Sequence, residues 1–200
     1  MSKQTLRNNM KTFFTLYLHF EHKRIVEYTD RKDVITQEHH TEWLIDIWNS
    51  QVSKSDKVFH LGDFSFSHKY NEIASVVKRL NGQKFFLKGN HDRSEVLDRL
   101  KDEHLIQDWW QYKEIKIQGT TACLFHFPIV SWHKRGYGSF CLHGHCHSSL
   151  PQDTGRILDV GIDNFYKLHG EHKLFSEQDV LGFMQGQEVY SVDHHKVIVE

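Results

Sequence analysis

The chain has 200 residues, which is enough for one domain with a hydrophobic core and too few for two domains of ordinary size. Its 25 Lys and Arg residues balance 26 Asp and Glu residues, giving a formal net charge of -1. This balance argues against a protein that coats nucleic acid and against a polybasic membrane anchor. The 13% aromatic content, with only two prolines, excludes a disordered or collagen-like chain.

The cysteines and the apolar runs indicate the cellular compartment of the protein. Cys123, Cys141 and Cys146 are odd in number and form no Cys-x-x-Cys pair, which is typical of a reducing compartment rather than of a disulfide framework. No apolar run reaches the ~18–20 residues that a membrane-spanning helix needs. We therefore expect one cytoplasmic domain over residues 1–200, in which residues 1–10 are either part of the fold or a loose N-terminal tail.

The first half of the chain predicts alternating strands and helices. Strands are expected at 12–18, 58–61 and 85–87, and helices at 36–50, 69–80 and 94–100. The second half is strand-rich, with strands expected at 112–118, 121–126, 139–143, 157–160, 188–192 and 196–199 and one helix at 176–185. This order predicts a layered α/β domain with mixed sheets and helices outside.

Several of the predicted strands end in residues that bind metals. These ends are Tyr17-Leu18-His19, Gly62-Asp63, Gly89-Asn90-His91-Asp92, His126 and Gly144-His145-Cys146-His147. Because sites in α/β sheets gather outside the carboxyl ends of strands, we expect these segments to meet. A carboxylate can bridge two ions, and imidazoles favour Mn, Fe, Ni or Zn over Mg or Ca. The pattern therefore predicts a centre with two divalent transition-metal ions.

In this order, the Gly-Asp, Gly-Asn-His-Asp and Gly-His-x-His motifs with His126 resemble those of the calcineurin-like metallophosphoesterases. The resemblance runs from about residue 12 to residue 165. It implies a four-layer αββα sandwich, with two mixed β-sheets flanked by helices. It also implies an enzyme that hydrolyses a small phosphomonoester or phosphodiester with a metal-bound hydroxide, with Mn²⁺ as the preferred ion and Fe, Ni or Zn as alternatives.

The resemblance further implies a role for each matching residue. Asp63 would bridge the two ions. The remaining ligands would be His19 and His147 at the first ion, and Asn90, His126 and His145 at the second. His91 would contact the phosphate and protonate the leaving oxygen, and Asp92 would orient His91 and raise its basicity.

The first motif departs from the family pattern, which is Asp-x-His. Tyr17 stands in place of the aspartate, so the first site lacks one negative charge and one hard oxygen. A Tyr17 phenolate or the nearby Glu21 could replace that ligand; otherwise the first ion is weakly held, different in identity or absent. The alternative function is a catalytically weakened or inactive member that binds metal or phosphate. A nuclease is a third reading, which the charge balance disfavours.

Overall fold

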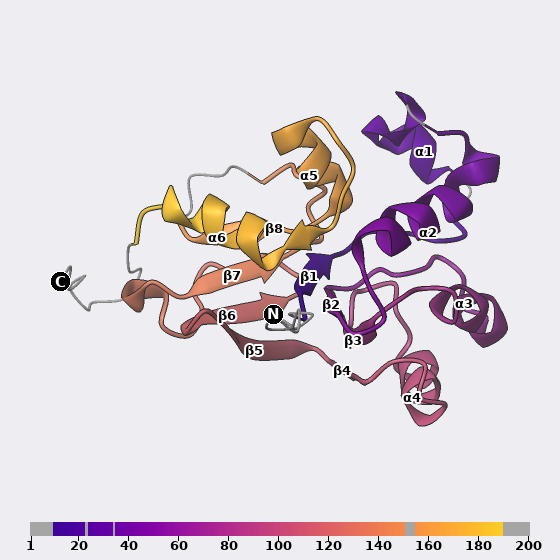
Figure 1. The fold of residues 1–200 in the computed structure, drawn as a ribbon, viewed down its shortest axis with the longest axis horizontal. Helices are drawn as coiled ribbons and strands as arrows, with labels where there is room; N and C mark the ends of the chain where they lie inside the picture. Colours follow the sequence, from indigo (N-terminus) through magenta and orange to yellow (C-terminus); the bar gives the residue numbers. More distant parts are fainter. Residues whose placement is uncertain (1–9, 23, 34, 151–154, 190–200) are drawn as a thin grey trace, which may run out of the picture.

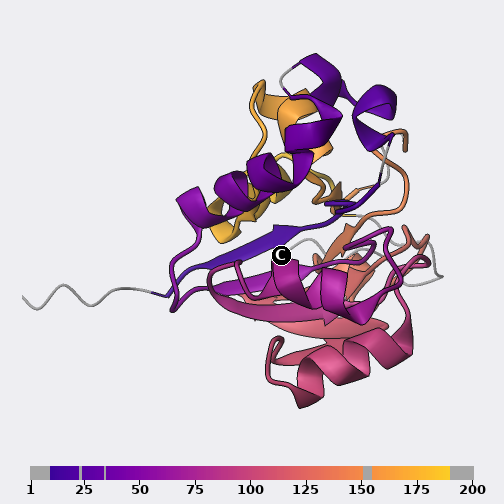
Figure 2. The same ribbon diagram turned by 90° about the vertical axis from the view of Figure 1, so that its right-hand side faces the viewer.

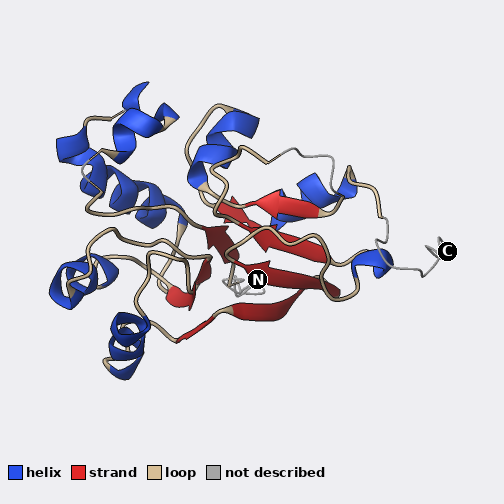
Figure 3. Ribbon diagram, turned by 180° about the vertical axis from the view of Figure 1, so that it is seen from behind, coloured by secondary structure: helices blue, strands red, loops and turns tan. Residues whose placement is uncertain are grey.

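The computed structural model describes residues 10–22, 24–33, 35–150 and 155–189. Within these ranges the strands form two sheets in the middle of the molecule, and the helices lie around them (Figures 1 and 3). Each sheet contains both parallel and antiparallel neighbours. The predicted α/β fold of two mixed sheets flanked by helices is therefore confirmed.

The first sheet has the strand order β4-β3-β2-β1-β9. Its strands are β1 (Thr12–Thr15), β2 (Lys57–His60), β3 (Gln83–Leu87), β4 (Asp108–Trp110) and β9 (Phe175–Ser176). The first four are parallel to one another, and β9 runs antiparallel to β1. The carboxyl ends of β1, β2 and β3 therefore open onto the same edge of this sheet.

Three helices cover the outer face of the first sheet. They are α2 (His40–Gln51), α3 (Tyr70–Val77) and α4 (Ser94–Asp102), and Figure 2 shows them from the side on which they lie. Leu44 and Trp48 of α2 are buried in the same apolar cluster as Phe13 of β1 and Phe86 of β3. These crossover helices thus bury one face of the sheet and fix the order of its parallel strands.

The second sheet has the order β5-β6-β7-β8. Its strands are β5 (Tyr112–Ile117), β6 (Thr120–Phe125), β7 (Phe140–His143) and β8 (Ile157–Asp159). Along β6, Ala122 and Leu124 pack in the cluster that also contains Phe14 of β1, whereas Cys123 packs in a separate cluster with Trp132. This alternation places a second large apolar cluster between the two sheets. Helices α5 (Ile162–His169) and α6 (Glu177–Gln185) contribute Phe165 and Met184 to it.

Some element boundaries differ from the prediction. The first strand ends at Thr15 rather than at residue 18, because Tyr17 adopts a left-handed backbone with φ of 56°. Helix α2 begins at His40, after a short 3-10 turn over Gln37–His39. Residues 188 and 189 are in no strand. The rest of the predicted strand 188–192, and all of 196–199, lie outside the described residues.

The sequence patterns missed six short or unusual elements. These are α1 (Ile25–Tyr28), the 3-10 turns Asp30–Asp33 and Arg135–Tyr137, β4, β9 and α5. Strands of two or three residues are too short to show a period. The first four residues of α5 are all buried although two of them, Asp163 and Asn164, are polar, so the residue types did not mark this turn as part of the core. In the part of the chain that is described, no helix is long and apolar enough to cross a membrane.

Candidate functional site

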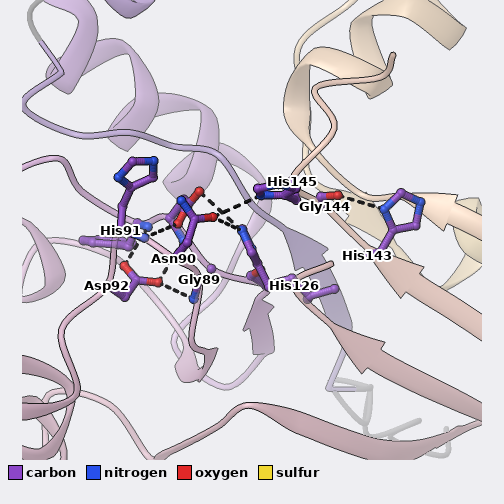
Figure 4. A network of polar contacts seen from close by, with 12 residues as sticks. Gly89, Asn90, His91, Asp92, His126, His143, Gly144 and His145 are labelled. Carbon is purple, nitrogen blue, oxygen red and sulfur yellow. Dashed lines mark hydrogen bonds and ion pairs between the residues drawn. The ribbon is translucent and has the colours of Figure 1, made fainter. Parts of the chain in front are cut away.

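Both sheets point the carboxyl ends of their parallel strands at one place. Asp63 and Asn90 follow β2 and β3 of the first sheet, and His126 and His145 follow β6 and β7 of the second. Figure 4 shows Asn90, His126 and His145 converging, while His143 lies on the far side of His145 and points away. Four segments that are far apart in the sequence thus meet as predicted.

Three contacts among the donor atoms of these side chains have the spacing of metal ligands. His126 Nε2 lies 3.4 Å from Asp63 Oδ2 and 3.0 Å from Asn90 Oδ1. His145 Nδ1 also lies 3.0 Å from Asn90 Oδ1. Ligand atoms that are each ~2.1 Å from a shared ion lie about 3.0–3.4 Å from one another. The donor set therefore fits one divalent transition-metal ion at the predicted second site.

Buried contacts prepare this second site for a ligand role. His126 is completely buried, and its Nδ1–H donates to the Leu61 carbonyl oxygen at 2.8 Å, which turns Nε2 toward Asp63 and the site. Burial opposes ionisation of Asp63, but the His126 ring and the backbone N–H of His91 outweigh it and hold the pKa of Asp63 below its ordinary value. Asp63 thus presents an ionised carboxylate.

The three residues predicted at or near the first ion form a stack of rings. The Tyr17 and His147 ring centroids are 3.9 Å apart with planes at 17°, and those of His19 and His147 are 5.4 Å apart at 10°. Burial, followed by the charge of Arg31, lowers the pKa of His19 to about 2, so its imidazole is neutral. A neutral imidazole is the form that binds metals.

Neither site is a complete set of charged or imidazole ligands. Across residues 10–22, 24–33, 35–150 and 155–189, no three His, Cys, Asp or Glu side chains already have the arrangement that holds an ion. At the second site Asn90 Oδ1 is an additional donor, 3.0 Å from both His126 Nε2 and His145 Nδ1. The Tyr17 hydroxyl and His19 Nδ1 are nevertheless buried, and neither has a hydrogen-bond partner among the described residues. Each such group costs ~1–3 kcal/mol, so these atoms fit a ligand that the protein alone does not supply.

Left-handed backbone conformations gather at these ligand positions. Tyr17, His19, Asp63, His145 and His147 all have φ between 44° and 69°. Each such residue costs roughly 1–2 kcal/mol when it is not glycine. Others of this kind, such as His104 and Gln118, lie in turns away from the site, but five of the ten left-handed non-glycine residues in the described chain stand at predicted ligand positions, and such clustering is typical of a functional site.

The Asp92 carboxylate joins the loops that follow β2 and β3. It accepts hydrogen bonds from the backbone N–H groups of Asp63 (2.8 Å), Phe64 (3.1 Å) and Gly89 (2.8 Å). The His91 N–H in turn donates to Asp63 Oδ1 at 3.0 Å. The partners of Asp92 thus differ from the predicted one, because its carboxylate holds backbone rather than the His91 ring, and we treat it as a positioning residue.

Glycine allows these two loops to touch. A Cβ on Gly89 would lie 2.2 Å from Asp63 Oδ1 and 2.5 Å from Asp63 N. A Cβ on Gly62 would lie 2.5 Å from His126 Nδ1, and Gly62 has φ of 102°. Real Cβ atoms do not approach other atoms so closely, so both positions need glycine on steric grounds.

A residue that the sequence analysis did not select, Arg31, holds the first loop from behind. It is completely buried and forms a bidentate ion pair with Asp163 through distances of 2.8 and 2.9 Å. Its other donors reach the Tyr17 carbonyl (2.6 Å), the Leu18 carbonyl (3.2 Å) and His40 Nε2 (2.9 Å). All five guanidinium N–H groups therefore have an acceptor. Its neighbours in the sequence are charged as on an ordinary surface turn, so no sequence signal identifies it.

His91 stands apart from the ligands, as its predicted role requires. It is partly exposed and lines a cleft of about 360 Å³ together with Asp63, Asn90 and His145. Its ring centroid is 4.6 Å from that of Phe66 and 6.3 Å from that of His19. The ring thus faces the space in which a substrate would meet the ligands.

The comparisons with known proteins agree with the resemblance. A family model described as calcineurin-like phosphoesterase matches residues 18–198. The gene 66 protein of Mycobacterium phage L5 is 29% identical over 194 residues, covering 82% of this chain and 92% of that protein. The gene 66 protein of Mycobacterium phage D29 is 30% identical over 183 residues, covering 78% and 89%.

A solved structure shares the fold. It is that of AQ665, a protein of unknown function from Aquifex aeolicus, and it superimposes with a TM-score of 0.66 at 19% sequence identity. The match covers 88% of this chain and all of the other. The two sheets and their connections are thus an arrangement that a second chain also adopts.

Replacing Arg31 should destabilise the protein strongly. Arg31→Met leaves the Asp163 carboxylate buried without its cation, and breaking such a pair typically costs about 3–5 kcal/mol. Urea unfolding measures this loss. Arg79→Met is the matched control, since its ion pair with Glu42 is exposed, and the urea midpoint should stay near that of the parent chain. Equal effects of the two changes would contradict the structural role of Arg31.

Replacing Gly89 should damage the contact between the two loops. Gly89→Ala forces its Cβ into the backbone and carboxylate of Asp63, and overpacking of this kind costs about 1–3 kcal/mol. Gly182→Ala in α6 is the control, because nothing lies within 4 Å of its added Cβ and alanine favours a helix by about 0.5–1 kcal/mol. The melting temperature should fall in Gly89→Ala and rise in Gly182→Ala. A higher melting temperature of Gly89→Ala would refute the close contact.

Proposed function

We propose that this chain, which belongs to the calcineurin-like phosphoesterase family, hydrolyses a small phosphomonoester or phosphodiester at the edge where the two sheets converge. Its family places it among the hydrolases that act on phosphoester bonds. The observation that carries the proposal is the convergence of Asp63, Asn90, His126 and His145 at 3.0–3.4 Å. The substrate, the reaction steps and a cytoplasmic location are parts of the proposal.

The converging side chains would hold divalent metal ions, on which the family generally depends. Asp63, Asn90, His126 and His145 would bind one ion, and Asp63 with His19 and His147 would bind a second. Mn²⁺ is the preferred ion and Fe, Ni or Zn are the alternatives, because imidazole-rich sets favour these metals. When bound, such ions lower the pKa of water toward ~7 and balance charge on the phosphoryl oxygens.

The protein's own groups would supply orientation and a proton. The Leu61 carbonyl keeps the His126 ring in the tautomer that exposes Nε2, and the His91 N–H holds Asp63 Oδ1 in place. The His91 ring, partly exposed in the cleft, would protonate the oxygen of the leaving alkoxide. Asp92 would act indirectly, by keeping His91 and Asp63 on touching loops.

A test of this proposal compares two variants in a hydrolysis screen with Mn²⁺, Fe²⁺, Ni²⁺ or Zn²⁺. Asp63→Asn should lose both metal binding and turnover, because the shared carboxylate is gone. His91→Ala should keep its metal content, measured by element analysis, and lose about 10²–10⁴ in rate on an alkyl ester, the usual worth of a positioned acid. Full activity of His91→Ala on an ester with such a poor leaving group would show that His91 is not the proton donor.

A second candidate function has an observation of its own. Tyr17 is 1% exposed and its ring lies face to face with His147, so it takes the place of the usual carboxylate with a packed aromatic ring. A chain in which this packing keeps the first ion out would bind metal or phosphate through the second site and turn over slowly or not at all.

Tyr17→Asp distinguishes these two functions. If the ring blocks the first site, the substitution should raise the metal content from one ion per chain to two and increase turnover by at least tenfold. If the parent chain already binds two ions, the substitution should leave the metal count at two. Element counting on the purified protein decides between them, and a parent chain with no bound ion under any of the four metals would contradict both.

A further inference from the structure

A second, larger cleft adjoins the one that contains the candidate ligands. The second cleft has a volume of about 840 Å³, within the ~300–1,000 Å³ range of small-molecule sites. His22, Tyr28 and Phe66 line both clefts, so they form the wall that the two spaces share. We call these three side chains the aromatic shelf. The space beyond the shelf is larger than a phosphoryl group alone requires.

Two of the three rings of the aromatic shelf are exposed rather than packed in the core. Tyr28 is 61% exposed and Phe66 is 39% exposed. His22 lies edge to face with both rings, with centroid distances of 4.1 Å to Phe66 and 6.3 Å to Tyr28. Exposed large rings that gather beside a cleft mark a binding surface, because burying them against a ligand is favourable.

The aromatic shelf also reaches the reacting end of the cleft. The Phe66 ring centroid is 4.6 Å from that of His91, the proposed proton donor, with ring planes at 32°. The chain next to Phe66 is anchored, since Ser65 Oγ donates to the Phe20 carbonyl at 3.0 Å. A group stacked on the shelf would therefore lie close to a phosphate bound at the ligands, and one molecule can supply both groups.

Two of the cations that line the second cleft, Arg24 and Lys69, are each paired with a carboxylate. Arg24 bonds to Glu27 at 2.8 Å and lies over the Tyr28 ring at 5.2 Å. Lys69 bonds to Glu72 at 2.8 Å. A strand of nucleic acid needs a row of cations for its successive phosphates, and these pairs do not provide one. The surface instead suits one uncharged, planar ring.

We propose that the aromatic shelf binds the base of a nucleoside phosphoester, so that the substrates of this site are mononucleotide-sized. The base stacks on Phe66 and Tyr28, and the ribose spans the distance to the phosphate at the ligands. Glu21 and Ser67 line the same cleft and offer hydrogen-bonding groups to the edge of a base. This inference rests on the proposed function, because the phosphate must lie at the metal ligands.

Binding of AMP, ribose 5-phosphate and phenyl phosphate to the Zn²⁺-loaded protein tests the inference. AMP should bind roughly tenfold or more tightly than ribose 5-phosphate, since stacking of one base contributes that much. In saturation-transfer NMR, the adenine H2 and H8 protons should receive the strongest transfer. Equal affinities of AMP and ribose 5-phosphate would overturn the inference, and so would phenyl phosphate binding as tightly as AMP.

Variants of the aromatic shelf sharpen this test. Tyr28→Ala and Phe66→Ala should bring the ratio of the two affinities toward one, whereas Phe66→Trp should keep it because the ring face remains. Tyr137→Ala is the matched control, since Tyr137 is 73% exposed and lies before the start of β7, whereas His145 lies after the end of that strand. An unchanged ratio in both alanine variants of the shelf would overturn the inference.

The outcomes also separate this inference from the proposed function. Preferential binding of AMP without hydrolysis of any ester, under any of the four metals, would contradict the proposed function and leave the aromatic shelf as a base-binding surface. Hydrolysis of small esters without any preference for AMP over ribose 5-phosphate would contradict the inference and leave the proposed function intact.

Discussion

One carboxylate that accepts three backbone N–H groups holds the candidate site together. Asp92 binds the loop after β2 through Asp63 and Phe64 and its own loop after β3 through Gly89. Because these contacts are to backbone N–H groups, they fix the position of the Asp63 main chain, and the Asp63 side chain therefore starts from a fixed point. The closeness of the two loops then makes glycine obligatory at the contact. The ligand geometry is thus set before any ion binds, which reduces the cost of organising the site.

Arg31 has the corresponding role behind the first motif, but with a different electrostatic consequence. Its guanidinium holds the Tyr17 and Leu18 carbonyls, and its charge helps to lower the pKa of His19 after burial. Asp163 neutralises much of this charge, but the first motif carries Tyr17 instead of a carboxylate, so it supplies no negative charge of its own to balance the rest. Asp63 is left as the negative group shared by both sites. In the proposed centre the second site would therefore be the one that binds a cation more strongly.

The features of the structure that follow from residue type and order could be predicted from the sequence. Strand ends that carry Asp63, Asn90, His126 and His145 could be recognised because parallel strands share an edge, so the motifs had to meet. Arg31 could not be recognised, because in the sequence a buried arginine with charged neighbours looks the same as a solvent-exposed arginine. The role of Asp92 was equally hidden, since its partners are backbone groups, which every sequence contains. Whether Tyr17 packs or binds an ion depends on ring stacking that spacing does not encode.

The arrangement separates the chemistry from the choice of substrate. The ligands lie at strand ends and are held by buried contacts, whereas the aromatic shelf comes from His22 and Phe66 in loops and from Tyr28 at the end of the four-residue helix α1, and its Tyr28 and Phe66 rings are exposed. Changes in such segments cost little stability, so substrate preference can vary while the ligand geometry stays fixed. Phe66 is where the two regions meet, because it touches His91 as well as the second cleft. A ligand stacked there would also limit the movement of the proposed proton donor, so recognition of the base and orientation of His91 are linked through one ring.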